Sequence, residues 1–186
     1  MAMMLDDGDA SDAELIGRAR DGDRSAFGAL VERHYDFVHR VAWRWSGNRT
    51  DAEDIAQEVC VRLGRAIRGW RGEGAFSTWL YAMTLNAARD MARKSARETV
   101  KTQAYGSEVL TLVQAADDAD EQAAELWHCV RLLPDKQREA VLLVYGEGLT
   151  HAAAADAMAI SEATVSWHIH EAKKRLKVLM RQAGEV

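Results

Sequence analysis

Apolar residues recur every three or four positions along most of this chain, the period that predicts amphipathic α-helices. Helices are expected over 25–45, from Thr50 or Asp51 to Ile67, and over roughly 76–94, with glycine-containing breaks between them. No segment shows the strict alternation of apolar and polar residues that predicts a half-buried β-strand. The pattern therefore predicts an all-α fold.

The last part of the chain predicts three shorter helices. The first begins at Pro134 and ends near the glycines of 146–148, because proline suits a first helical turn and glycine suits a left-handed cap. Thr150 and Ser161 are expected to cap the other two, which a tight turn at 158–160 separates. Two helices joined in this way predict a helix-turn-helix, whose second helix enters the DNA major groove.

The final helix has one continuous apolar stripe, which runs through Val165, Ile169, Ala172, Leu176 and Leu179. Away from this stripe, polar and aromatic residues come first and cations come last. An early turn that touches base edges, followed by cations that hold phosphate, is typical of a DNA-reading helix. The alternative is an amphipathic surface helix with a solvated lysine face. The residues away from the stripe are Glu162, Ser166, Trp167, His170, Lys173, Lys174 and Lys177.

Formal charge divides the chain into blocks, although the whole chain carries a net charge of −5. Residues 25–97 carry 12 basic and 8 acidic side chains, whereas residues 98–125 carry 1 basic and 7 acidic side chains. Residues 126–186 are close to neutral, and residues 1–24 are acidic. This alternation indicates two globular modules joined by an acidic linker.

Two small helical domains joined by a flexible acidic linker are therefore expected. An ordinary solvated loop would have the same composition as the linker, and the two interpretations are compatible. The expected divisions are an acidic N-terminal segment at 1–24, a first domain at 25–97, the linker at 98–122, a second domain at 123–181 and a tail at 182–186.

Several other classes of protein find little support in the sequence. No apolar run approaches the roughly 20 residues of a membrane helix, and the acidic start does not resemble a signal peptide, so a cytoplasmic protein without membrane insertion is expected. Cys60 and Cys129 lie 69 residues apart on predicted helices, and two reduced, half-buried thiols are expected rather than a disulfide. Neither belongs to a CxxC motif, which excludes the common zinc patterns. His168 and His170 point in different directions on a helix, which is poor spacing for metal ligands. No catalytic residue, metal site or cofactor is predicted.

Two polar features of the first module need more than packing to explain them. Asp54, Gln57 and Glu58 form an acidic strip, for which compensation of the helix dipole and an ion pair from Glu58 to Arg62 are the favoured explanation on spacing alone. Aromatic residues also gather with cations and an amide around the glycine-rich turn at 69–74, as in proteins that bind single-stranded nucleic acid. Core packing of the aromatic rings is the alternative. This second group comprises Trp70, Arg71, Phe76, Trp79, Asn86, Arg89, Arg93 and Lys94.

Four segments together resemble the sigma-70 family of bacterial RNA polymerase sigma factors, specifically its extracytoplasmic-function (ECF) group. The family's D-A-E-D-x-x-Q-E segment is similar to TDAEDIAQEVCVRL, and its F-x-x-W-L-x-x-x-x-x-N-x-x-x-D-x-x-R segment to FSTWLYAMTLNAARDMARK. The two halves of its C-terminal DNA-binding domain resemble LPDKQREAVLL and ISEATVSWHIHEAKKRL. All four occur in the family's order, and the resemblance covers residues 25–181.

The resemblance implies a sigma factor, a subunit without catalytic activity that binds core RNA polymerase and directs it to promoters. The acidic strip would dock on the clamp helices of the β′ subunit, further contacts would reach the β subunit, and an anti-sigma factor would be another partner. The third helix, over roughly 76–94, and the loop before it would melt the −10 element and capture a base extruded from the single strand. The helix-turn-helix would read duplex DNA at the −35 element. The residues implied are Asp51, Asp54, Gln57 and Glu58 for polymerase; Arg71, Phe76, Trp79, Asn86, Arg89 and Arg93 for the −10 element; and Glu162, Thr164, Ser166, Trp167, His170, Lys173 and Lys174 for the −35 element.

The chain also departs from the family pattern. Ser166 stands where the family usually carries a basic residue, and Trp167 is unusual in a recognition helix. Ala159 stands where the turn commonly has glycine, so a positive φ there would be strained. The stretch TVSWHIH also resembles the recognition helix of LuxR-type regulators. A LuxR-type regulator that acts without polymerase docking is therefore the alternative, although it accounts for 135–181 and not for the residues before them.

Overall fold

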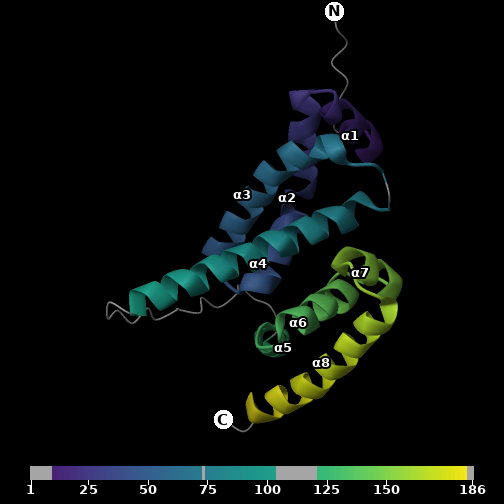
Figure 1. The fold of residues 1–186 in the computed structure, drawn as a ribbon. Coiled ribbons are helices and arrows are strands. Elements are labelled where there is room, and N and C mark those ends of the chain that lie inside the picture. The colour runs from purple at the N-terminus through teal and green to yellow at the C-terminus, as the bar shows by residue number, and fades with distance from the viewer. Residues whose placement is uncertain (1–9, 73, 104–120, 184–186) are drawn as a thin grey trace, which may run out of the picture.

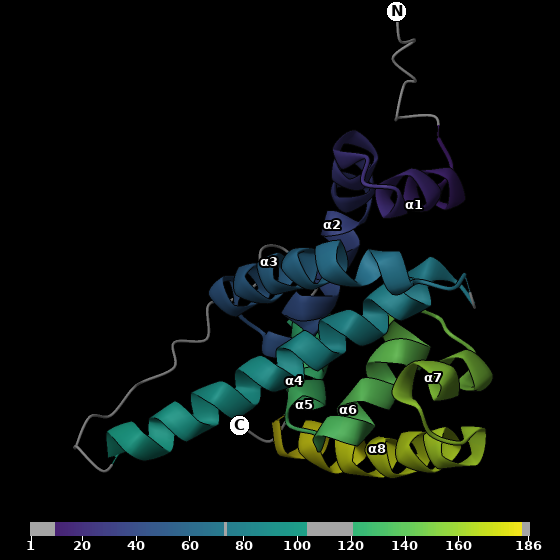
Figure 2. The same ribbon diagram turned by 45° about the horizontal axis from the view of Figure 1, so that its top comes forward.

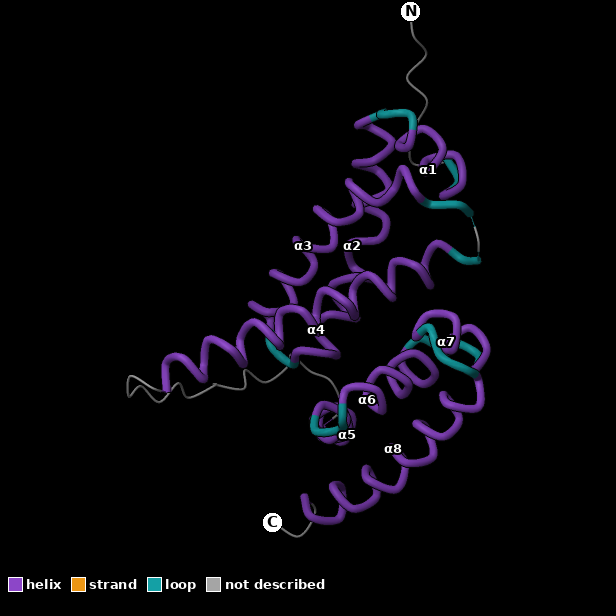
Figure 3. The backbone as a smooth tube through the Cα atoms, in the orientation of Figure 1, coloured by secondary structure: helices purple, strands orange, loops and turns teal. Residues whose placement is uncertain are grey.

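The computed structural model describes residues 10–72, 74–103 and 121–183, and every regular element in these ranges is helical (Figures 1 and 3). The expectations for residues 1–9 and 104–120 lie outside the described residues. The first bundle consists of α1 (Asp12–Arg20), α2 (Arg24–Ser46), α3 (Arg49–Ala66), the short 3₁₀ helix η1 (Ile67–Gly69) and α4 (Phe76–Gln103). The second consists of α5 (Glu121–Arg131), α6 (Asp135–Val141), the π-helical turn η2 (Leu142–Gly146), α7 (His151–Met158) and α8 (Glu162–Ala183).

The first bundle is built around α2, which packs against α1, α3 and α4. The expected apolar stripe of α3 is confirmed, since Ile55, Val59, Leu63 and Ile67 are all buried. Each fully buried aliphatic side chain of this kind contributes roughly 1.5–3 kcal/mol.

The cap of α3 differs from the prediction. Thr50 and Asp51 were the candidate caps, but the Asn48 side chain accepts a hydrogen bond from the Asp51 backbone N–H at 2.7 Å, and the helix begins at Arg49. Gly47 adopts the left-handed conformation with φ 77°, which ends α2 and turns the chain at once. Because the turn is complete within one residue, the next residue becomes the cap.

Part of the acidic N-terminal segment folds onto the first bundle. Ser11 and Glu14 form a reciprocal capping box at the start of α1, which explains why a helix begins there. Leu15 and Ile16 on α1 are buried against the bundle. Asp12 fixes this helix to α2, since its carboxylate lies 2.9 Å from the Arg33 guanidinium and 2.8 Å from a ring nitrogen of His34. The charge pattern alone did not predict this helix.

Helix α4 is longer than expected, since it continues past Lys94 to Gln103 and enters the segment assigned to the linker. The linker assignment rested on acidic charge. Charge does not prevent helix formation, and no glycine or proline interrupts the chain between Ala75 and Gln103. The inward-facing residues of this helix are largely as expected: Leu80 and Ala87 are buried, and Met83 and Met91 are partly buried.

The second bundle contains the expected helix-turn-helix. Thr150 accepts a hydrogen bond from the Ala153 N–H at 3.1 Å, and Ser161 accepts one from the Thr164 N–H at 3.2 Å, so both predicted caps are confirmed. Val165, Ile169 and Ala172 bury one side of α8, as the stripe predicted. Helix α6 does not run as a single α-helix to the glycines at 146–148, because its last turn widens into η2.

Ala159, in the turn between α7 and α8, has φ 53° and ψ 46° and is the one non-glycine residue with positive φ in the described ranges. We expect Ala159→Gly to raise the free energy of unfolding by about 0.5–1 kcal/mol. Relief of the left-handed conformation contributes about 1–2 kcal/mol, and glycine's greater freedom in the unfolded chain offsets part of it. Urea denaturation measures the effect. Ala157→Gly in regular helix is the control and should destabilise by about 1 kcal/mol, so loss of stability at position 159 would contradict the strain argument.

The two bundles pack against each other. Helix α5 contacts α2, and α7 contacts α4 (Figure 2). Tyr81 of α4 is 1% exposed, its hydroxyl has no hydrogen-bond partner, and it lies within the electrostatic influence of Glu139 and Glu147 from the second bundle. The face between the bundles is therefore closed to solvent around this side chain.

Candidate nucleic-acid interface

The outward face of α8 is the first candidate surface. Trp167 is 55% exposed, an unusual state for an indole ring, and its ring lies edge-on to His168 at 5.0 Å between centroids. Glu162, Ser166 and His170 are exposed beside it. The structure therefore brings these four predicted residues together on one solvent-facing surface, at the N-terminal half of the helix.

Two of the predicted residues, Ser166 and Thr164, are held by neighbours. The Ser166 hydroxyl lies 2.9 Å from Nδ1 of His151 at the start of α7, and the Thr164 hydroxyl lies 2.7 Å from that of Ser161. These contacts fix the recognition helix to the turn and to α7, and they occupy groups that would otherwise reach a base.

The two predicted lysines differ in their surroundings. Lys174 forms an ion pair with Glu171 at 2.9 Å, a hydrogen bond that lowers the pKa of the Glu171 carboxyl. The Lys173 ammonium lies 5.2 Å from the centre of the Tyr145 ring. Lys173 is therefore the less constrained of the two as a phosphate contact.

A cluster of three aromatic rings forms the second candidate surface, at the start of α4. The Trp70 and Trp79 centroids are 5.0 Å apart, and Phe76 lies 5.9 Å from Trp70 and 5.7 Å from Trp79. Phe76 is buried, which confirms core packing for this ring, whereas Trp79 is partly exposed. Trp79 and Trp70 are therefore the rings on which a base can stack.

A cavity of about 510 Å³ lies beside this cluster, between the loop and α1. The loop contributes Arg71 and two glycines with positive φ, Gly72 and Gly74, which have no heavy atom near the position of a Cβ. Helix α1 supplies the opposite wall with Asp12 and Arg20. The sequence did not identify α1 as part of this site, because its residues lie 50 or more positions before the loop.

The remaining predicted −10 residues lie along α4 at helical spacing. Asn86 is exposed and its side-chain oxygen accepts a hydrogen bond from Arg89 at 2.7 Å. Arg89 turns toward the second bundle, where its guanidinium lies 3.3 Å from the Glu139 carboxylate. Arg93 remains exposed but pairs with Asp90, whose pKa this hydrogen bond lowers, with a further contribution from Arg62. The structure therefore leaves Asn86 and Arg93 at the surface and draws Arg89 away from it.

The acidic strip on α3 is the third candidate surface. Asp54, Gln57 and Glu58 are exposed on it. The expected pair between Glu58 and Arg62 is confirmed at 2.7 Å. Among the described residues Asp54 has no ion-pair partner, so its carboxylate is the one in this strip that is available to another molecule.

Asp51 has a different role in the helix from the rest of the strip. Its carboxylate accepts a hydrogen bond from the Asn48 side-chain amide at 2.6 Å and is part of the helix cap. The docking role that the resemblance implies for Asp51 stays a prediction.

Comparison with known proteins assigns both bundles. Residues 30–98 match the family described as Sigma-70 region 2, and residues 123–176 match Sigma-70, region 4. The chain is 31% identical over 173 residues to the ECF RNA polymerase sigma factor SigM of Mycobacterium tuberculosis, a match that covers 91% of this chain and 85% of SigM. This chain belongs to the ECF group of the sigma-70 family.

Other sigma factors support the same assignment. The RNA polymerase sigma-H factor of Pseudomonas aeruginosa is 29% identical, over 92% of this chain and 97% of its own length. The ECF sigma factor SigE of Mycolicibacterium smegmatis is 33% identical, although this chain spans only 63% of its length. Among solved structures, RpoE in complex with the anti-sigma factor NepR from Bartonella quintana has the same fold, with a TM-score of 0.69, 19% identity and coverage of 83% of this chain and 96% of RpoE.

The family assignment decides between the two sequence interpretations. A LuxR-type regulator would explain the helix-turn-helix of this sigma factor but not the region 2 match over 30–98. The ion pair between Glu58 and Arg62 that spacing predicted is present, and the docking role of the acidic strip stays a prediction from the resemblance.

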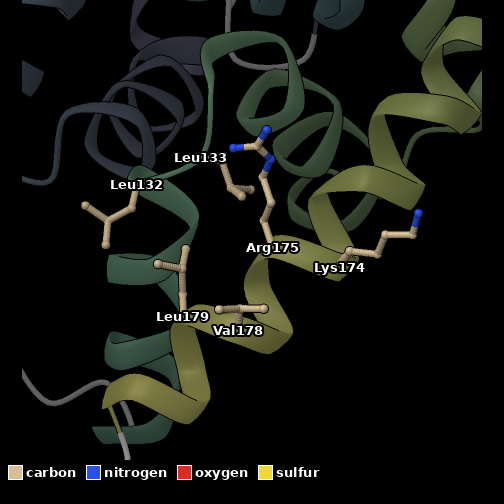
Figure 4. Close-up of a pocket in the computed structure, with 6 residues that line it drawn as sticks. All are labelled: Leu132, Leu133, Lys174, Arg175, Val178 and Leu179. Atoms are coloured by element: carbon tan, nitrogen blue, oxygen red, sulfur yellow. The ribbon is translucent and has the colours of Figure 1, made fainter.

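An apolar groove of about 330 Å³ lies at the far end of α8 from the reading surface of this sigma factor. Figure 4 shows the side chains of Leu132 and Leu133, in the turn that follows α5, facing Val178 and Leu179 of α8. Leu132 is 57% and Val178 55% exposed, so the groove presents apolar surface to solvent. The groove is therefore a candidate contact surface for a protein partner.

The cysteine and histidine expectations can also be compared with the sigma-factor structure. Cys60 and Cys129 are both free, and burial raises the pKa of each thiol, which makes a reactive thiolate unfavourable. His168 is partly buried, and burial lowers its pKa, whereas His170 is exposed, so the two rings do point in different directions. No group of three potential metal ligands gathers among the described residues. Within those same ranges, no helix combines the length and hydrophobicity needed to span a bilayer.

Proposed function

We propose that this sigma factor reads promoters with two separate surfaces while a third holds it on core RNA polymerase. The first domain, residues 25–97 together with α1, would bind polymerase and the −10 element, and the second, residues 123–181, would bind the −35 element. The observation that carries this proposal is the presence, in one chain with both sigma regions, of an exposed recognition helix and of an aromatic cluster beside a cavity.

Polymerase docking is assigned to the acidic strip on α3. Asp54 is the principal contact because its carboxylate is exposed and unpaired among the described residues, and Gln57 and Glu58 extend the surface by one helical turn. The partner would be the clamp helices of the β′ subunit. The apolar groove at Leu132 and Val178 would meet the β subunit, since these exposed side chains lie beyond the exposed residues within 162–170 of the proposed DNA surface; Lys174, which also lines the groove, would stand at the border between the two surfaces.

Capture of the −10 element is assigned to the loop before α4 and to the exposed face of that helix. An extruded base would enter the cavity lined by Arg71 and Trp70 and stack on Trp70 or on the neighbouring Trp79, while Asn86, Arg89 and Arg93 follow the single strand. Extrusion of a base costs a few kcal/mol, and one stacking contact contributes about 1–3 kcal/mol, so one or two rings suffice to offset it.

Reading of the −35 element is assigned to the exposed face of α8, with Trp167 as its most distinctive residue. We expect Trp167→Ala to weaken binding to the −35 duplex by about 1 kcal/mol, roughly fivefold, because the indole would lose apolar contact with a thymine methyl. Gel-shift titration with promoter duplex measures the change. Val178→Ala, an equally exposed apolar residue on the same helix, is the matched control; equal losses in both variants would contradict the assignment.

Other features of the function follow from the same role. Sigma factors are not enzymes, and we propose that this one carries no catalytic activity of its own. Its place of action would be the cytoplasm, where RNA polymerase works. An anti-sigma factor would regulate it, by analogy with RpoE of Bartonella quintana, whose structure contains the anti-sigma factor NepR.

Run-off transcription with purified core RNA polymerase tests the whole proposal. With a genomic promoter library as template, we expect transcripts that depend on the sigma factor and whose aligned starts share −35 and −10 sequences. Binding of duplex DNA without any such transcript would contradict the proposal and favour a regulator that acts without polymerase.

A further inference from the structure

Ion pairs cross the interface between the two bundles, and in each of them the cation belongs to the first bundle and the anion to the second. The first bundle supplies arginines and the second supplies glutamates: Arg44 lies 2.6 Å and Arg40 3.7 Å from the Glu147 carboxylate, and Arg89 lies 3.3 Å from that of Glu139. The most cationic part of the chain, residues 25–97, therefore meets two carboxylates of its own second domain.

These carboxylates are shielded from water. The side chain of Glu139 is 1% exposed and that of Glu147 is 11% exposed. Arg44 is also held by the Gly146 carbonyl oxygen, which accepts a hydrogen bond from it at 2.8 Å, and it lies 5.1 Å from the Trp127 ring. A shielded ion pair is expensive to break when it leaves a charge without a partner. Both ion-pair partners of Glu147 belong to the first bundle, whereas Glu139 keeps Lys136 of its own bundle at 3.2 Å, so the contacts of Glu147 do most to select one arrangement of the domains.

Further contacts between the domains join particular side chains across the interface. The Arg138 guanidinium of α6 lies 3.8 Å from the Trp45 ring centre on α2 and donates a hydrogen bond to the Trp45 carbonyl oxygen at 3.4 Å. Gly47 sits so close to Arg131 that a Cβ would meet its guanidinium at 2.5 Å. The packed arrangement is thus fitted to the side chains on both faces.

This arrangement does not suit a protein bound to a whole promoter. Helix α8 packs on α7 and α7 packs on α4, so two helix layers separate the proposed −35 and −10 surfaces by only about 20 Å. The two promoter elements are about 25 base pairs apart, roughly 85 Å along B-form DNA. The domains must separate before both surfaces can be occupied.

We propose that the second domain acts as a built-in inhibitor of the first. Carboxylates of Glu139 and Glu147 occupy Arg89 and Arg44 as DNA phosphates would, and they keep Arg89 from the −10 strand until the domains part. This inference rests on the proposed assignment of Arg89 to the −10 element. It assigns a role to Arg44, Glu139 and Glu147, which the promoter-reading surfaces do not use.

The full-length double variant Glu139→Gln, Glu147→Gln tests whether the second domain inhibits the first. Both changes keep side-chain size and remove the negative charge that holds the arginines. The control, Glu32→Gln with Asp36→Asn, removes the same charge from two exposed positions on α2. Small-angle X-ray scattering reports the radius of gyration, and fluorescence anisotropy reports affinity for a labelled single-stranded dT20 at several salt concentrations.

We expect the double variant to have a larger radius of gyration than the native protein and roughly tenfold higher affinity for dT20 at low salt. Two arginines released to phosphates should steepen the slope of log affinity against log salt by about 1.4, which a general loss of packing would not do. The control should change affinity less than twofold and leave the radius unchanged.

Other outcomes overturn the inference. Expansion without a gain in affinity means that the contact orders the domains but masks no DNA-binding group. A gain shared with the control means that net charge alone is responsible. Unchanged radius and affinity mean that no such inhibition exists. None of these results depends on polymerase, so run-off transcription could still succeed and leave the sigma-factor function intact.

A second pair of variants, in which the charges of Arg44 and Glu147 are exchanged, distinguishes loss of the ion pair from misfolding. Arg44→Glu should place two carboxylates together and expand the molecule, whereas Arg44→Glu with Glu147→Arg should restore the ion pair and the native radius of gyration. Failure of the exchanged pair to restore compactness, with helical content unchanged by circular dichroism, would show that this contact does not hold the domains together.

Discussion

Asp54→Lys should weaken binding to core RNA polymerase by about 2–3 kcal/mol, roughly 30- to 150-fold, and reduce promoter-specific transcription in proportion at limiting sigma factor. The reason is that Asp54 offers an exposed carboxylate without an ion-pair partner among the described residues. Replacing it with an ammonium removes a charge-assisted hydrogen bond and adds repulsion toward any cation on the polymerase. Surface plasmon resonance with immobilised core enzyme measures the affinity directly.

Glu53→Lys makes the same change of charge one residue earlier, about 100° around the helix, where the native carboxylate already pairs with Arg49 at 2.8 Å. This variant should lose less than about 1 kcal/mol, the value typical of an exposed ion pair. If both variants bound polymerase equally poorly, general electrostatics rather than a specific docking residue would be responsible, and the assignment of Asp54 would fail.

Trp79→Ala should reduce open-complex formation by about 1–3 kcal/mol, between 5- and 150-fold, through loss of the ring on which the extruded base stacks. Trp79 is partly exposed and lies 5.0 Å from Trp70, which lines the cavity, so the change affects the base-binding surface more than the core. Permanganate footprinting of unpaired thymines in the −10 element measures the melted fraction.

A premelted promoter separates the possible causes. If the −10 element is supplied already single-stranded, a ring that serves only melting becomes dispensable, whereas a ring that binds the extruded base remains necessary; we expect the defect to persist. Trp43→Ala, a partly buried tryptophan on α2 outside the loop, controls for loss of packing. A similar defect in that variant would indicate damage to the fold instead.

Much of the fold could be predicted because local signals and burial agree. The apolar stripe of α3 and the caps at Thr150 and Ser161 depend on residues within one or two helical turns of each other. They could therefore be predicted from the sequence. The predicted cap of α3 was wrong by two or three residues, because Asn48 competes with nearby capping residues and only the Gly47 conformation decides between them.

The candidate sites were predicted in part. The resemblance to the ECF group supplied the residues of all three surfaces, and the structure leaves Asp54, Trp79 and Trp167 accessible. Which residues were available to a ligand depended on contacts between distant parts of the chain. The pairing of Arg89 with Glu139 joins positions 50 residues apart on different helices, and no periodicity of the sequence encodes it.

Ionisation of the Tyr81 phenol should report whether the two domains are packed together or apart. Burial, with the nearby charges of Glu147 and Glu139, holds the pKa of this phenol well above its ordinary value. Two of these causes depend on the second bundle, so separation of the domains should let the phenol ionise at lower pH. Ultraviolet absorbance during an alkaline titration would then count closed and open molecules without a fluorescent label, and it would follow their exchange when a partner is added.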